Sequence, residues 1–256
     1  EAWEPIWTNF VHQAGATWGD YLKMLDDNAA YFSRLDIQVS DVTDLTGFEL
    51  RQADALSPLV TLASAVDAAV PAPGLSLSFA RAFAQPISRR YQLGRLGRGW
   101  TDSWQISLQQ DNGIVEIEDM SGTIRTFHPD SRSGAYFAQA GDEGTLTKLA
   151  DGRFSLRESD GMRYVFRTDG KLDYVEDTNG NRITRGYTGD LLTSLTHSSG
   201  ASLALVYNPA GRIVQITDSL GRQTQFTYDA SDEHLLAVQE YDGRVTGYTY
   251  SLGQGI

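Results

Sequence analysis

Hydrophobic and polar positions follow two different periods along this chain, and the period changes near residue 74. Before that point, beyond Thr17 as a plausible N-cap, apolar residues recur at steps of three and four. The stripe consists of Trp18, Tyr21, Leu22, Leu25, Ala29, Phe32 and Leu35. It predicts an amphipathic helix, and a weaker helical or mixed pattern continues over residues 44–69.

After Pro71, Pro73 and Gly74 the period becomes two, as in Leu75, Leu77 and Phe79, which alternate with small or polar residues. Such alternation is typical of a strand with one buried face. No long helix is predicted from here to residue 256. The fold class we predict is mainly β: an antiparallel hairpin meander forming a curled or spiralling sheet, with a small N-terminal helical segment. The predicted domains are 1–70 (mainly helical), 71–105 (β, rich in Arg) and 106–256 (repeat sheet).

The last hundred residues contain an internal repeat in which a glycine precedes a tyrosine by seven residues. The pairs are Gly180 with Tyr187, Gly200 with Tyr207, Gly221 with Tyr228, and Gly243 with Tyr250. The glycines are spaced by 20, 21 and 22 residues, which predicts two short strands and one glycine turn per unit. We expect each tyrosine ring to stack on its counterpart in the next unit or to pack beneath it.

Residues 75–256 should therefore give more than about ten strands, and an open twisted sheet of that size usually curls or splits. A propeller with two units per blade is the alternative architecture.

Composition narrows the function classes. The 256 residues include 33 acidic and 21 basic side chains and no Cys, with a formal net charge of −12. This charge argues against general nucleic-acid binding, and the lack of Cys excludes disulfides and Cys-based metal or thiol chemistry. No apolar run approaches the roughly 20 residues of a membrane span. We expect no cofactor.

Residues 71–105 form a basic block between two acidic regions, with five Arg and one acidic residue. The arginines are Arg81, Arg89, Arg90, Arg95 and Arg98. The plainest interpretation is that they neutralise carboxylates of the same chain. An anion site for phosphate or an acidic glycan is the alternative, since Arg pairs with either group.

Other candidate sites have simpler interpretations. His12, His128, His197 and His234 lack metal-ligand spacing, so no metal site is predicted. Residues 177–181 resemble a calcium loop only in part and are interpreted as a hairpin turn. The adjacent carboxylates at 142–143 and 232–233 lie in predicted polar turns, and residues 94–99 are predicted to form a tight turn before a buried Trp100. Trp3, Trp7 and Trp18 are expected to pack in a core, with a ligand platform as the alternative.

Residues 177–182, 208–213 and 221–229, the last reading Gly-Arg-Gln-Thr-Gln-Phe-Thr-Tyr-Asp, resemble the Rhs/YD-repeat family. That family includes bacterial Rhs proteins, the C component of insecticidal toxin complexes, and teneurins. Residues 75–104 resemble the opening of Rhs cores. The matching positions there are Arg81, Phe83, Gly97, Gly99 and Trp100. The resemblance covers about residues 75–256 and implies a β-strip that spirals into a hollow shell around a polypeptide, often a toxin.

The family's C-terminal self-cleavage motif has no match here, so the resemblance assigns no catalytic residue. We predict a non-enzymatic structural segment of a large bacterial protein, secreted or at the cell surface. Its expected partners are the rest of the parent polypeptide or further copies of the chain, joined through β-edges. The alternative is a carbohydrate-binding or adhesin module, with a glycan as its ligand. A polysaccharide hydrolase is a third hypothesis, which would require two carboxylates facing each other across a cleft.

Overall fold

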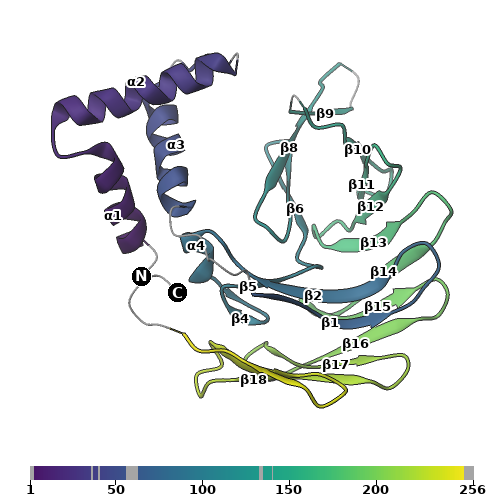
Figure 1. Cartoon of the computed structure of the whole chain (residues 1–256). Coiled ribbons are helices and arrows are strands. Elements are labelled where there is room, and N and C mark those ends of the chain that lie inside the picture. The colour runs from purple at the N-terminus through teal and green to yellow at the C-terminus, as the bar shows by residue number, and fades with distance from the viewer. Residues whose placement is uncertain are drawn as a thin grey trace.

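The computed structural model describes residues 3–35, 37–39, 41–55, 63–132, 135–139 and 141–250. It is mainly antiparallel β structure with a helical lobe at the N-terminal side (Figure 1). No helix in these ranges is long and apolar enough to span a membrane.

The helical lobe contains α1 (Trp3–Ala14), α2 (Trp18–Arg34) and α3 (Val42–Ala55). Thr17 caps α2 as predicted: its hydroxyl accepts the Asp20 amide, and the Asp20 carboxylate accepts the Thr17 amide. Ile6, Phe10, Leu25 and Leu45 are among the buried residues of a small core separate from that of the sheets. Figure 1 shows this lobe standing beside the sheets.

The helical pattern predicted through residue 69 ends earlier, at Ala55. Residues 64–70 form strand β1 (Ser64–Val70), which pairs with β2 (Leu77–Phe83) and, through it, with β5 (Trp100–Asp102). A sheet partner only a short loop away overrides the weak helical pattern here. The part of that pattern at residues 56–62 lies outside the described residues. We call β1, β2 and β5 the opening sheet.

Between β2 and β5 lie the one-turn helix α4 (Ile87–Arg90) and a hairpin of β3 (Leu93–Gly94) and β4 (Gly97–Arg98). The tight turn predicted for residues 94–99 is this hairpin, and it leads into Trp100, which is buried as expected.

A four-stranded meander follows. It comprises β6 (Ser107–Asp111), β7 (Ile114–Glu118), β8 (Ile124–Pro129) and β9 (Tyr136–Ala138). Strand β9 lies beside β10, so this sheet and the next one follow one continuous curve (Figure 1).

The remaining strands form one open meander of 11 strands in sequence order. They are β10 (Thr145–Lys148), β11 (Phe154–Arg157), β12 (Arg163–Phe166), β13 (Leu172–Glu176), β14 (Arg182–Thr188), β15 (Leu191–His197), β16 (Ser202–Tyr207), β17 (Ile213–Asp218), β18 (Gln223–Tyr228), β19 (Leu235–Gln239) and β20 (Val245–Gly247). Each repeat supplies two of these strands, as predicted. The β structure has split into separate sheets, and the long one is a continuous meander rather than a set of blades.

The opening sheet packs against one face of the long sheet, with β1 against β17 and β2 against β15. This inner face carries the apolar core, including Leu203, Leu205, Ile216 and Phe226. The opening segment therefore fills the concave side of the repeat sheet.

Candidate functional site

The four repeat tyrosines each make the same kind of hydrogen bond, and we call this set of bonds the tyrosine relay. Each hydroxyl donates to the backbone carbonyl of the residue 15 positions earlier. The pairs are Tyr187 to Leu172 at 2.9 Å, Tyr207 to Leu192 at 2.7 Å, Tyr228 to Ile213 at 2.7 Å, and Tyr250 to Leu235 at 2.8 Å. The four phenols therefore share one orientation relative to the sheet.

Strand register explains why the relay recurs. Tyr207 lies opposite Ile213 in the β-ladder, and the Ile213 carbonyl is the acceptor for the next tyrosine, Tyr228. A bulge comes directly before Tyr187, Tyr207 and Tyr228. A bulge re-aims the side chain that follows it, so each unit repeats the same geometry. Phe166 occupies the matching position after a bulge in the earlier unit, without a hydroxyl.

The relay replaces the ring-on-ring stacking expected from the sequence. Within the described residues no two of these four tyrosine rings are in stacking contact; Tyr250 instead contacts Phe83 and His234. Each phenol is partly buried, and this burial raises the pKa of Tyr187, Tyr207, Tyr228 and Tyr250. The phenols are thus kept neutral and able to donate.

The four repeat glycines occupy tight turns at the opposite end of each hairpin. All have positive φ, between 81° and 95°, and a Cβ there would meet nothing within 4 Å. Backbone conformation, rather than crowding, therefore explains these glycines. At 177–181 the Asp177 carboxylate accepts the Asn179 and Asn181 amides at 2.8 and 2.9 Å. This segment is the predicted hairpin turn.

Two residues of the opening sheet, Arg81 and Trp100, contact tyrosines of the last repeat. Arg81 forms a buried ion pair with Asp67 of β1 and donates to the Tyr248 hydroxyl at 2.6 Å. Trp100 donates its indole N–H to the Tyr250 hydroxyl at 2.8 Å and packs edge-on against Tyr248. The two hydrogen bonds to these tyrosines join residues that are 150 or more positions apart in the sequence, and they hold the opening sheet against the inner face of the long sheet.

Gly97 and Gly99 lie where any side chain would clash with a neighbouring group. A Cβ on Gly97 (φ 94°) would lie 2.8 Å from the Glu233 carbonyl oxygen, and one on Gly99 (φ 73°) would lie 2.7 Å from the Phe83 ring. The hairpin binds the repeat sheet at both ends. The Arg98 amide donates to Glu233 at 2.7 Å, and the Ile213 amide donates to the Arg95 carbonyl at 2.9 Å.

The basic block is neutralised largely within the chain, as predicted. Four of its arginines pair with carboxylates: Arg81 with Asp67, Arg89 with Glu118, Arg95 with Asp102, and Arg98 with Glu233. Arg90 donates to the Ala84 and Gln85 carbonyls. The sequence did not single out Asp67, Asp102 or Tyr248 as partners, although a lone acid in the small-residue strand 64–70 was a usable signal for Asp67.

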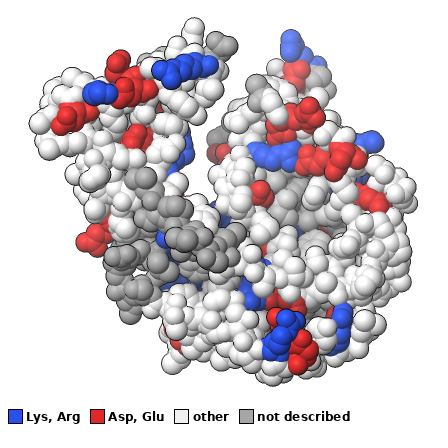
Figure 2. Space-filling view, in the orientation of Figure 1, with Lys and Arg blue, Asp and Glu red and all other residues white. Residues whose placement is uncertain are grey.

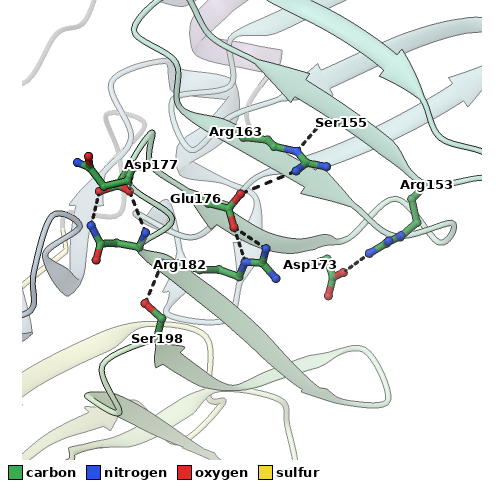
Figure 3. A network of polar contacts seen from close by, with 10 residues as sticks. Arg153, Ser155, Arg163, Asp173, Glu176, Asp177, Arg182 and Ser198 are labelled. Atoms are coloured by element: carbon green, nitrogen blue, oxygen red, sulfur yellow. Dashed lines mark hydrogen bonds and ion pairs between the residues drawn. The ribbon is translucent and has the colours of Figure 1, made fainter.

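Charged side chains also fix the register of the repeat strands (Figure 3). Arg163 and Arg182 lie opposite Glu176 on its two neighbouring strands, and both pair with its carboxylate. Arg153, directly before β11, reaches past β12 and pairs with Asp173 of β13 at 3.0 Å. The face shown in Figure 2 accordingly carries interspersed acidic and basic residues.

Other candidate residues are placed as follows. The carboxylates of Asp142 and Glu233, members of the two adjacent acidic pairs, bind Arg125 and Arg98. The described residues contain no group of three His, Cys, Asp or Glu able to hold a metal.

The tryptophans contradict the expected core packing. Trp3, Trp7 and Trp18 are 57%, 48% and 71% exposed, because three short helices enclose too small a core to cover them.

Comparison with known proteins agrees with this geometry. The RHS Repeat family model matches residues 207–233, and the model of a domain of unknown function (DUF6531) matches residues 60–127, which include the opening sheet. The chain is similar to double-stranded DNA deaminase toxin A of Burkholderia cenocepacia (strain H111), with 27% identity over 230 residues and 75% of this chain covered. It spans 15% of that toxin's length. The family-model matches and this relative support the resemblance of the chain to the Rhs/YD-repeat family.

Proposed function

We propose that this chain builds the first part of a β-shell in a larger, toxin-related Rhs protein and has no enzymatic activity of its own. The observation that carries the proposal is the continuous curved sheet of repeated hairpins, whose inner face is filled by the opening sheet. In this arrangement the opening sheet covers the inner face at the beginning of the shell, and further hairpins can extend the long sheet.

The edge strand β20 supports extension of the sheet. It pairs with β19 on one side, and Val245, Thr246 and Gly247 are all exposed. An exposed strand edge accepts another strand by backbone pairing. Within a larger protein that strand would come from the next repeat, and in the isolated chain from a second copy.

Residue content argues against a zinc-dependent deaminase centre within this chain. Zinc-dependent nucleobase deaminases hold their metal through His and Cys ligands, and this chain has four His and no Cys. If the parent protein is a deaminase like its relative, we infer that the catalytic centre lies in another part of it. We also propose secretion or surface display, by analogy with the family.

Light scattering of the isolated chain across a range of concentrations tests the β20 edge. We expect self-association, and Val245→Lys should reduce it because a charged edge residue opposes strand addition. Val206→Lys is the matched control, since Val206 is an exposed valine on the interior strand β16. A strictly monomeric chain at high concentration would contradict edge-driven assembly, and deamination of double-stranded DNA by the purified chain would contradict the non-enzymatic role.

One observation favours a second candidate function. The exposed Trp3 and Trp7 rings stack on one face of α1, with centroids 5.9 Å apart. Exposed aromatic rings of this kind suit the apolar faces of sugars, so a glycan-binding role is the alternative. A glycan array without hits would remove its support.

A further inference from the structure

Arg185 breaks the pattern of the repeat on its inner face. It lies in β14 two residues before Tyr187, whereas the corresponding residues before the next three tyrosines are Leu205, Phe226 and Tyr248. Arg185 is nevertheless only 6% exposed. A buried cation thus occupies a position that the other units fill with an uncharged side chain.

The guanidinium of Arg185 has few partners. Its Nη2 donates to the Trp104 carbonyl at 2.6 Å, while Nε and Nη1 are buried and have no hydrogen-bond acceptor among the described residues. The carboxylate of Asp102 is already bound by Arg95 through two contacts of 2.6 Å. Burial lowers the pKa of Arg185 to about 10, so the group remains charged at neutral pH. A buried charge without a counter-ion is strongly unfavourable.

Arg185 lines an open pocket of about 270 Å³ between residues 95–107 and the long sheet. Arg95, Lys171 and Tyr187 line it too, beside the Trp104–Ser107 segment. Asp190, the one acidic residue of the lining, has a 96% exposed side chain and binds Lys171 at 2.7 Å. The Lys171 ammonium also donates to the Gly189 carbonyl at 3.2 Å and lies 3.8 Å from the Asp169 carboxylate. Of the three cations that line this space, Arg95 is paired with Asp102 and Lys171 with Asp190, so Arg185 is the one without a counter-ion among the described residues.

We propose that this pocket binds a small oxyanion, a carboxylate or a phosphate group, through the free N–H groups of Arg185 and the ammonium of Lys171. Charge-assisted hydrogen bonds from Arg and Lys to such oxygens are among the strong contacts in proteins. The bound anion supplies the counter-charge that the chain itself does not provide. This is not the anion site considered for the basic block, whose arginines are mostly paired with carboxylates.

A purely structural role for Arg185 makes different predictions. The guanidinium carbon lies 5.5 Å from the Tyr187 ring centroid and 6.0 Å from that of Trp104. Cation–π attraction alone then compensates part of the burial. In that case, added anions have no specific effect on the chain.

Isothermal titration calorimetry of the whole chain distinguishes the two roles. Inorganic phosphate and acetate are titrated separately at constant ionic strength, with chloride as the reference salt. We expect saturable binding of at least one anion, and the responding anion identifies the source as phosphate or carboxylate. Arg185→Leu, which copies the residue at position 205, should weaken binding at least about tenfold, because a charge-assisted contact contributes more than 1.4 kcal/mol.

Two further variants keep the test decisive. Lys171→Met, at a half-buried position, should weaken binding even if Arg185→Leu fails to fold. Arg132→Leu, at an exposed arginine that pairs with Asp130, should leave binding unchanged. Absence of saturable binding of both anions, or an unchanged dissociation constant in both pocket variants, would overturn the proposal.

Discussion

The tyrosine relay predicts the effect of removing a single oxygen atom from the sheet. In Tyr228→Phe the ring stays and only the hydrogen bond to the Ile213 carbonyl, at 2.7 Å, is lost. Phe166 shows that the site accepts a phenylalanine ring after the same kind of bulge. The steric change is therefore small, and the loss of stability should come from the hydrogen bond.

The magnitude follows from burial. A neutral hydrogen bond contributes about 0.5–1.5 kcal/mol net, and leaving a buried acceptor unpaired costs about 1–3 kcal/mol. Ile213 is fully buried, so we expect Tyr228→Phe to lower the free energy of unfolding by about 1–2 kcal/mol. Tyr228→Ala also removes the ring and should cost about 3–5 kcal/mol.

Urea unfolding measures this difference directly. With a loss of about 1.5 kcal/mol and an m-value of about 3 kcal/mol/M, the midpoint should fall by about 0.5 M. Tyr174→Phe is the matched control, because Tyr174 is buried in the same sheet and its hydroxyl makes no hydrogen bond within the described residues. Equal losses in Tyr228→Phe and the control would refute the importance of the relay.

Three further predictions concern pH, turns and buried charge. Burial raises the pKa of Tyr187 and Tyr228, so above about pH 10 the unfolded state loses its phenol protons first. The free energy of unfolding should therefore fall with rising pH. A flat profile in urea unfolding between about pH 8 and about pH 11 would contradict this. Gly221→Ala, at φ 81°, should cost about 1–2 kcal/mol by the same assay. Asp102→Ala leaves Arg95 without its counter-ion and should cost about 3–5 kcal/mol, whereas Arg95→Met with Asp102→Leu should recover most of the melting temperature; no recovery would show that the pair itself is essential.

The repeat was predictable because its determinants are local. Glycine at a positive-φ turn and alternation over five or six residues both lie within one hairpin, so the spacing of Gly180 and Gly200 was enough to place the strands. The partner of each tyrosine was not predictable in the same way. The hydroxyl binds a backbone carbonyl, whose location depends on a bulge that no residue type at this position specifies.

The contacts of the opening sheet also could not be predicted from the sequence. Arg81 binds Asp67 on the neighbouring strand of the opening sheet and Tyr248 just after β20 of the long sheet. Neither partner lies at a spacing from Arg81 that the sequence pattern marks. The exposed Trp3 and Trp18 were misassigned for a related reason: hydrophobicity indicates which residues favour burial, but the size of the enclosing lobe decides how many can be buried.

The sequence distance between the opening segment and its partners bears on synthesis in the cell. Arg81 and Tyr248 are separated by 167 residues, and Trp100 and Tyr250 by 150. At about 5–20 residues per second, a ribosome needs about 10–30 s to deliver the second member of each pair after the first. During this interval the apolar side of the opening strands lacks its cover, so a nascent chain of this kind should depend on chaperones that hold exposed strands until translation has passed the final tyrosine.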